Sequence, residues 1–223
     1  MSSARTAQRA IGRPPRIAGI DARESLLDAA VELFAENGVA GTPIAAIAAR
    51  AGVTPAMVHY YFRNRDQLLD AVAGERLLRI VSGVWTPVAA CKELEPMLRG
   101  LVQRIVQAAE VNPWLPSLWL REVVSEGGQL RARLVRFLRL ELIQHLISTV
   151  AAAQRRGEIS AEIEPRLVPV SVLGLTLLPL ANLRLLQQVP LLRGVGRKDI
   201  GRHAEALLAS AFAKAPRRRA LSR

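Results

Sequence analysis

The side chains that most often perform catalysis are few in this chain of 223 residues. Its histidines are His59, His145 and His203, and its one cysteine is Cys91. No two of them lie four residues apart, the spacing that places two metal ligands on one face of a helix, and the sequence has neither a glycine-rich phosphate loop nor a Gly-x-Ser-x-Gly motif. We therefore predict a protein that is not an enzyme, with no catalytic residues, no metal site and no cofactor.

Glu122 and Glu126 lie one helical turn apart, a spacing at which two carboxylates can act as an acid–base pair. Trp119 and Arg121 lie beside them. Charged residues at this spacing more commonly form the solvent-exposed face of a helix, and we expect an exposed face here.

Residues 54–65 suggest a different chemistry, because small, polar and basic side chains follow one another there. A helix that enters the major groove of DNA needs such residues on its exposed side and apolar residues behind them. The candidates for the exposed side are Thr54, Pro55, Ala56, Met57, His59 and Tyr60, and phosphates flanking the groove would meet Arg63 and Arg65. The residues expected to close the core behind this face are Ile44, Ile47, Val53, Val58 and Phe62.

Three helices must position these side chains. Apolar residues at three- and four-residue steps predict the first helix over residues 21–37, and Gly38 supplies the left-handed backbone that ends it. Thr42 followed by Pro43 predicts the N-cap and first residue of a second helix, because a hydroxyl can accept an orphan N–H and proline has none to lose. This second helix should run to about residue 51.

The connection to the third helix is also marked in the sequence. Gly52 permits a positive φ, and Thr54 with Pro55 repeats the pattern of a cap followed by proline. The third helix is predicted over residues 55–61. Two short helices joined by a turn that contains glycine form a helix-turn-helix, here over residues 42–62.

A family resemblance follows from this register. From Gly41 to Leu69 the sequence reads GTPIAAIAARAGVTPAMVHYYFRNRDQLL, and Ala30, Phe34 and Gly38 precede it at the matching spacing. These residues resemble the tetracycline-repressor (TetR) family over about residues 21–70. The resemblance implies an all-α fold of about nine helices, with a three-helix DNA-binding domain at residues 21–66 and a helical ligand-binding and dimerisation domain at residues 67–214.

The resemblance also assigns roles to single positions. Thr42 and Thr54 match capping positions near phosphates. The early recognition helix is matched by Pro55, Ala56 and Met57. Frequent DNA contacts are matched by Tyr60, Tyr61 and Arg65. Two positions depart from the family pattern, because His59 stands where tyrosine is usual and Ala45 where some members have a polar side chain that reads bases. Ala56 and Met57 favour contact with thymine methyl groups.

The charge of +12 is unevenly placed. Residues 1–20 and 214–223 contain bases and no acid, namely Arg5, Arg9, Arg13 and Arg16 at one end and Lys214, Arg217, Arg218, Arg219 and Arg223 at the other. In residues 21–65 the acids outnumber the bases by one. Arg13 lies in Gly12-Arg13-Pro14, which resembles the core of an AT-hook and could enter the minor groove. We expect a disordered basic arm at 1–20 and a basic tail at 215–223, and a solvated tail without function is an equally good interpretation of the arm.

Composition limits the cellular setting. Half of the residues are apolar and few are aromatic, which is typical of helices packed on helices. A single cysteine allows no intrachain disulfide. The N-terminus has no apolar signal-peptide core, and the longest uncharged run, residues 167–183, is short for a membrane span and contains prolines. We predict a soluble, cytoplasmic protein with no membrane association.

Beyond residue 66 helical patterns continue between glycine and proline breaks, over residues 66–85, 93–111, 114–125, 130–156, 166–188 and 198–214. The side chains proposed to line a pocket for a hydrophobic small-molecule effector are Trp85, Met97, Trp114, Trp119, Phe137, His145 and Asn182. For any one of them, ordinary core is the more common role. The segment 166–188 is apolar on nearly all sides, so it must be covered, and with 198–214 it fits a homodimer interface. Pro179 predicts a kink in it.

These features predict a homodimeric, ligand-responsive regulator of transcription that binds double-stranded operator DNA. We expect a repressor that a hydrophobic small molecule releases from a pseudo-palindromic operator, through the helix over residues 66–85 that joins the two domains. An architectural DNA-binding protein without an effector is the alternative, and a protein that binds a membrane surface is a third.

Overall fold

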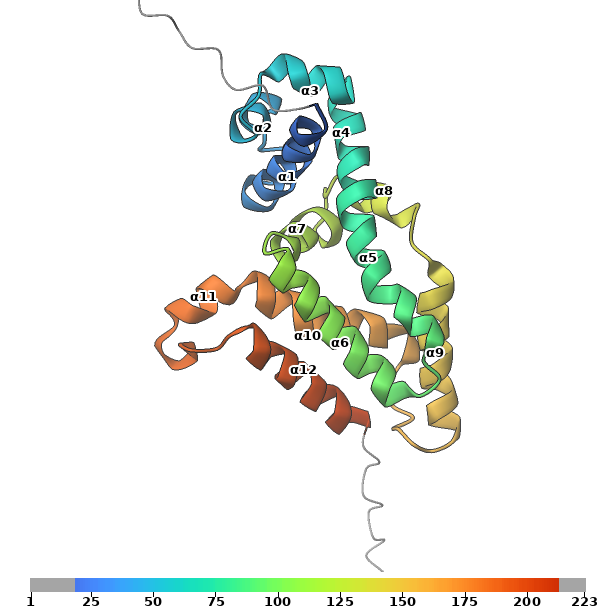
Figure 1. Cartoon of the computed structure of the whole chain (residues 1–223). Coiled ribbons are helices and arrows are strands. Elements are labelled where there is room, and N and C mark those ends of the chain that lie inside the picture. The colour runs from blue at the N-terminus through green and yellow to red at the C-terminus, as the bar shows by residue number, and fades with distance from the viewer. Residues whose placement is uncertain (1–18, 213–223) are drawn as a thin grey trace, which may run out of the picture.

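A computed structural model describes residues 19–212, and within this range all regular secondary structure is helical (Figure 1). The prediction of an all-α chain is therefore confirmed. The predicted basic arm and tail, including Arg13, fall largely on residues 1–18 and 213–223, which lie outside the described residues. In Figure 1 a small group of helices, α1 to α3, sits above a larger helical body.

The head consists of α1 (Gly19–Asn37), α2 (Ile44–Arg50) and α3 (Pro55–Phe62). Its core forms as the periodicity predicts, with Ile47, Val58 and Phe62 at most 2% exposed. The remaining two predicted core residues, Ile44 and Val53, are partly buried and pack against this core. The three-helix prediction is therefore confirmed.

The turns between the head helices follow the glycine positions. Gly38 has φ +77° after α1 and Gly52 has φ +70° after α2, the left-handed conformation that each was expected to supply. The prediction that Thr42 caps α2 with its side chain is wrong, because its hydroxyl donates to the carbonyl of Gly38 at 2.7 Å. Pro43 is the N-cap residue instead.

One continuous helix leads from the head into the body. It comprises α4 (Arg65–Ala71), the π-helical η1 (Val72–Leu77) and α5 (Leu78–Trp85), close to the predicted range of 66–85. The Asn64 side chain caps its start by accepting from the N–H of Gln67 at 2.9 Å. Figure 1 shows this helix running from α3 down one side of the body.

The body contains the remaining helices. They are η2 (Thr86–Ala90), α6 (Leu94–Val111), α7 (Leu115–Trp119), η3 (Leu120–Val124), α8 (Arg131–Val135), α9 (Leu140–Arg155), η4 (Pro165–Leu167), α10 (Val168–Ala181), α11 (Leu183–Gln188), η5 (Pro190–Leu192) and α12 (Arg197–Phe212). Helices α6, α10 and α12 pack against one another, and α7 lies directly below α1 (Figure 1).

Two predicted helices are interrupted. The segment 130–156 breaks at residues 136–139, because Leu134 and Leu138 pack into the hydrophobic cluster shared with the head, whereas Leu146 packs into the cluster of the lower body. The segment 166–188 breaks at Asn182, three residues after Pro179. Proline has no N–H and its ring crowds the carbonyl four residues before it, so its effect falls on the turn before Pro179. The break comes after that turn, where the Asn182 side chain donates to the carbonyl of Leu178.

The core of the head continues into the upper body. A single cluster joins Phe34 of α1 to Leu77 of the connecting helix and to Leu115 and Leu118 of α7. Apolar contacts therefore cross the predicted domain boundary near residue 66.

The turn at Gly38 yields a stability prediction. An added Cβ there would lie 3.2 Å from Arg121 Cδ and 3.3 Å from Glu122 Oε1, in addition to the cost of a positive φ. We expect Gly38→Ala to lower the free energy of unfolding by about 1–2 kcal/mol, as measured by urea denaturation.

Gly83→Ala is the matched control, because Gly83 lies in α5 with ordinary helical φ and open space around its Cα. This change should raise stability by about 0.5–1 kcal/mol through helix propensity. Equal effects of the two substitutions would show that the turn imposes no special constraint.

Candidate functional site

The outer face of α3 carries most of the residues proposed to meet DNA. Pro55, Ala56, His59 and Tyr60 are exposed, Tyr60 by 79%, and the N-cap residue Thr54 is exposed as well. Met57 is half-buried. Val58 and Phe62 fall on the opposite side because of the helical period, and they are buried in the head. The helix thus presents a row of small, polar and aromatic side chains on a rigid support.

A tight turn follows α3. Arg63 has φ +51° and ψ −49°, and the N–H of Asn64 donates to the carbonyl of Phe62, which makes a γ-turn centred on Arg63. Such a backbone conformation costs about 1–3 kcal/mol in a residue with a side chain. The His59 ring lies 3.3 Å from the Arg63 carbonyl, close enough for Nδ1–H to donate to it. Arg63 itself is exposed beside the α3 face.

Arg65 and Thr42 serve the interior of the head. The Arg65 guanidinium donates to the carbonyl of Thr42 at 2.8 Å and to that of Val39. The Thr42 side chain is 1% exposed, so it is not part of the outer face. Tyr61 is half-buried and packs against the head core, with its ring 5.1 Å from that of Tyr60. These three residues hold the α1–α2 connection and α3 in place.

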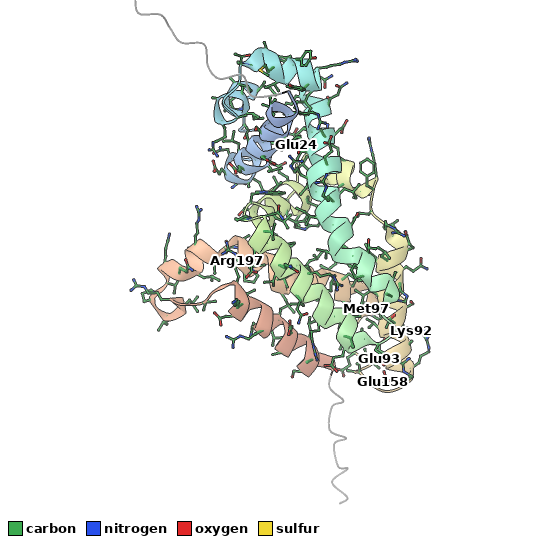
Figure 2. All side chains as sticks on the ribbon, viewed as in Figure 1. Glu24, Lys92, Glu93, Met97, Glu158 and Arg197 are labelled. Atoms are coloured by element: carbon green, nitrogen blue, oxygen red, sulfur yellow. The ribbon has the colours of Figure 1, made fainter. Side chains whose placement is uncertain are left out.

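Four acidic side chains of α1 are paired with arginines. Arg50 reaches Glu32 and Glu36 at 3.1 and 3.2 Å, and its single positive charge offsets part of the charge of these two carboxylates. Arg76 of the connecting helix reaches Glu24 and Asp28, each at 2.8 Å, and Figure 2 shows Glu24 on the side of α1 toward that helix. These pairs reduce the repulsion that the acids of α1 would otherwise exert on a polyanion.

A further ion pair ties α1 to η1. Arg23 donates to both oxygens of Glu75, at 2.6 and 2.7 Å, and its guanidinium lies 5.2 Å from the centre of the Phe62 ring. The hydrogen bond from Arg23 lowers the pKa of Glu75 below its usual value, against the opposing effect of burial. Folding therefore gains from this pair above the usual carboxyl pKa, and the gain is lost as the pH falls through the lowered pKa of Glu75.

Glu122 forms the most direct polar contact between head and body. The expectation that it lies on an exposed face is wrong, because its side chain is only 5% exposed. Oε1 accepts the backbone N–H of Val39 at 2.7 Å, and Oε2 accepts that of Gln129 at 3.0 Å. A buried carboxylate is tolerated when such donors replace water. Glu126 is exposed as expected.

Glu122 lies close in sequence to a residue that lines an apolar cavity. Trp119, three residues earlier in the chain, and Trp85 both line a cavity of about 30 Å³ between α5, α6, α7 and α10. Trp85 and Phe137 line a second cavity of about 20 Å³. Small-molecule sites measure about 300–1,000 Å³, so helices around these cavities must separate before an effector can enter.

The other proposed pocket residues have separate structural roles. Met97 is fully buried in the lower body, and Trp114 packs against the cluster shared with the head. His145 Nε2 lies 2.9 Å from the carbonyl of Cys91, to which an N–H there donates. Asn182 caps α10, since its side chain donates to the carbonyl of Leu178 at 2.8 Å. The structure therefore brings Trp85, Trp119 and Phe137 to cavities and leaves these four elsewhere.

A larger cleft of about 1060 Å³ lies between α6, the end of α9 and α12. Its rim is charged on both signs, with Glu93 and Glu158 at the lower end of the body in Figure 2 and arginines 99, 156 and 202 around them. No sequence motif pointed to it, because its residues come from three distant segments. Charged side chains surround this cleft, whereas the two smaller cavities have mainly apolar linings.

One side of α10 is apolar and exposed. Leu167, Val170 and Leu178 are 58%, 62% and 54% exposed, and Ser171 and Gly174 lie between them on the same side. Leu207 of the neighbouring α12 is 42% exposed. Among the described helices, none is long and apolar enough to span a membrane, and residues 19–212 hold no cluster of three or more metal-ligating side chains.

Comparisons with known proteins agree with the geometry of the head. Residues 26–72 match the model of the bacterial regulatory proteins of the tetR family. The nicotine-responsive transcriptional repressor HdnoR of Paenarthrobacter nicotinovorans is 36% identical over 69 residues, 31% of this chain and 36% of that protein. The transcriptional regulator BetI of Rhizobium meliloti is 28% identical over 98 residues, 44% of this chain and 48% of that protein. The chain thus spans less than half the length of either relative.

Solved structures are similar over most of the chain. AibR in complex with isovaleryl coenzyme A and operator DNA aligns with a TM-score of 0.67 at 19% identity, covering 87% of this chain and 100% of that chain. The transcriptional regulator FadR of Bacillus subtilis in complex with stearoyl-CoA gives 0.62 at 18% identity, covering 86% and 99%. These likenesses extend the shared fold to the body. The head, residues 26–72, therefore matches the tetR family of bacterial regulatory proteins, and the chain as a whole shares the fold of these solved structures.

Proposed function

We propose that this chain is a ligand-responsive, DNA-binding regulator of transcription, and that it represses until a hydrophobic small molecule releases it from its operator. The observation that carries the proposal is the exposed face of α3 on a head that Glu122 connects to the wall of an apolar cavity. Relatives named as a nicotine-responsive repressor and as a regulator bound to an acyl-CoA and operator DNA support it.

On this proposal α3 enters the major groove. Thr54, Pro55 and Ala56 begin the helix, where recognition helices approach base edges, and Tyr60 is exposed for contact with a base or phosphate. Arg63 meets a phosphate beside the groove. Arg65 and Thr42 contribute by holding the α1–α2 connection, and the N-terminal arm with Arg13 adds minor-groove contact from outside the described residues.

A second copy of the chain covers the apolar side of α10. A stripe formed by Leu167, Val170 and Leu178 is too apolar to favour contact with water, and the small Ser171 and Gly174 allow another helix to approach closely. A two-fold axis through this stripe places two α3 helices on the two halves of a pseudo-palindromic operator. The protein then functions as a homodimer.

The cavity controls the head through two connections. An effector between Trp85 and Trp119 separates α5 from α7 because the cavity is far smaller than a ligand. Movement of α7 and η3 displaces Glu122, and with it the backbone of Val39 in the head. Movement of α5 is carried to the head by the continuous helix α4–η1–α5. A difference of a few kcal/mol between the two arrangements is sufficient to change operator occupancy.

The DNA-binding proposal predicts a defined loss in Tyr60→Ala. Binding sites would first be selected from random duplexes with the wild-type protein, and affinity for the selected sequence then measured by fluorescence anisotropy. We expect Tyr60→Ala to weaken binding about tenfold or more, because a hydrogen bond to a charged group contributes about 1.5–3 kcal/mol. The fold should not change, since the Tyr60 side chain is 79% exposed.

Val111→Ala is the control, because Val111 is an exposed residue at the end of α6 in the body, 73% accessible and remote in sequence from α3. Its affinity for DNA should stay within about twofold of wild type. Failure of the wild-type protein to enrich any sequence would contradict the proposal and favour an architectural DNA-binding protein. Equal affinities of wild type and Tyr60→Ala would exclude α3 as the reading helix.

The dimer proposal is tested by Leu178→Glu. A carboxylate in the apolar stripe would be buried without a partner, so we expect the variant to be monomeric in sedimentation equilibrium at concentrations where the wild type is dimeric. Leu140→Glu is the matched control, since Leu140 is an equally exposed leucine, 64% accessible, at the start of α9. A wild-type monomer, or a Leu178→Glu dimer, would refute this interface.

A further inference from the structure

Arg104 of α6 has unused hydrogen-bonding capacity inside the body. Its side chain is half-buried, and Nε–H donates to the carbonyl of Val84 at 2.8 Å. Nη2 is buried and, among residues 19–212, has no hydrogen-bond partner. Burial lowers the pKa of Arg104 from its usual value, and the charge of the nearby Cys91 acts weakly in the other direction. A guanidinium carries five N–H donors and almost never loses its proton, so its charge persists in this setting.

Three other half-buried arginines within residues 19–212 pair with carboxylates, and a fourth, Arg65, donates to two backbone carbonyls. Arg23, Arg76 and Arg133 have side chains between 13% and 32% exposed, and each reaches a carboxylate within 2.8 Å. Arg99, which precedes Gly100 and lies on the same helix as Arg104, is paired with Glu95. No ion pair of Arg104 occurs within the described part of the chain. A shielded cation without an anion is costly, which indicates a site suited to one.

Two further details describe the surroundings of this guanidinium. A Cβ on Gly100 would lie 2.8 Å from Nη1 of Arg104, so the missing side chain leaves the space that the guanidinium occupies. The groups near the guanidinium are the carbonyl of Val84 and Cys91, and the carbonyl of Cys91 is in turn bonded to Nε2 of His145. Lys92 and Glu93 follow Cys91 at the lower end of the body (Figure 2).

Arg104 adjoins the apolar cavity between α5, α6, α7 and α10. Val84, whose carbonyl accepts from Arg104, also lines that cavity. Ala108 lines it too, and it lies one helical turn after Arg104 on the same side of α6. The remaining wall is aliphatic and aromatic, with Ile80, Ile105 and Trp119 among its members. A cationic group therefore lies at the border of a site whose interior is apolar.

We propose that Arg104 binds the carboxylate of an amphipathic effector whose apolar chain enters the cavity beside Trp85 and Trp119. This inference rests on the proposed function and adds the chemical class of its ligand, an organic monocarboxylate. The carboxylate supplies the acceptor that Nη2 lacks, and the chain occupies the space that opens as α5 and α7 separate. The Nε–H bond to Val84 holds the guanidinium at the border in the free protein.

The test compares octanoate with octan-1-ol as probes, using isothermal titration calorimetry on the full-length protein. The two probes share an apolar chain and differ in the charged head, so the ratio of their Kd values isolates the contribution of the carboxylate. In Arg104→Gln we expect this ratio to shift about tenfold against octanoate, while octan-1-ol binds as to wild type. Arg104→Lys should retain part of the preference because it keeps the charge.

Arg99→Gln is the matched control, since Arg99 lies on the same helix, is exposed and has its own carboxylate partner. It should bind both probes with the wild-type ratio. The inference is overturned if Arg104→Gln leaves the ratio unchanged, if Arg99→Gln shifts it equally, or if the wild type shows no saturable binding of octanoate. Thermal melts of each variant would identify any loss of binding that comes from unfolding.

A separate measurement distinguishes this inference from the proposed function. Without any probe, Arg104→Gln should bind the selected DNA sequence within about twofold of wild type, because Arg104 lies in the body. If the wild type binds DNA sequence-specifically but Arg104→Gln leaves the ratio of the two Kd values unchanged, the proposed ligand class is wrong and the proposed function stands. Absence of sequence-specific binding by the wild type contradicts the proposed function, whatever the probe ratio.

Discussion

The carboxylate of Glu122 is the interaction on which the relation between head and body depends. It is nearly excluded from water, and its two oxygens accept backbone N–H groups from opposite sides, one from Val39 in the head and one from Gln129 in the body. A buried carboxylate is stable when such donors compensate the loss of hydration. Because both donors belong to the backbone, a shift of η3 must move the α1–α2 connection or break one of the bonds.

The groups around this carboxylate restrict the movement of the backbone that it contacts. Gly38 has a positive φ beside it, and a side chain at Gly38 would collide with Arg121 and Glu122. Arg65 holds the carbonyls of Val39 and Thr42 from the other side. The backbone that follows α1 is therefore bonded to the body through one residue and to the connecting helix through another. A change in the body that moves Glu122 or Arg65 therefore also moves the backbone that supports α3.

Apolar packing and charge pairing act in the same direction. The head core and the upper body share one hydrophobic cluster, which includes Phe34, Leu115 and Leu118. Acids and arginines also pair between α1 and η1. Arg23 of α1 reaches Glu75 of η1, and Arg76 of η1 reaches Glu24 of α1. The head is thus a nearly neutral unit held against α7 and η1, and its orientation is set by the body.

Local patterns allowed much of the head to be predicted. Glycine at positive φ, proline at a helix start and the spacing of Ile47, Val58 and Phe62 act over a few residues, so they are visible in the sequence. The exposed side of α3 follows from the same period. The interior roles of Thr42 and Arg65 depend on carbonyls that only the folded turn presents, and no local pattern encodes them.

The candidate sites in the body were less predictable for a related reason. Glu122 looked like a surface residue because helical spacing does not reveal which helix covers it, although an acid in the apolar stretch 115–124 was a usable signal. Arg104 gave no signal, since its lack of a partner is a property of the packed body. Trp85 and Trp119 were found by their size and apolar setting, whereas Met97 and His145 shared those features and belong to structural contacts.

Amide hydrogen exchange in Glu122→Gln tests the central claim most directly. A carboxamide can accept one of the two backbone N–H groups but presents its own donors to the other, so one bond must be lost. We predict that protection at Val39 or Gln129 falls about tenfold or more relative to wild type, consistent with about 1–3 kcal/mol for an unsatisfied buried donor, while Glu126→Gln leaves both unchanged. Unaltered protection at both amides in Glu122→Gln would contradict the view that this carboxylate joins the head to the body.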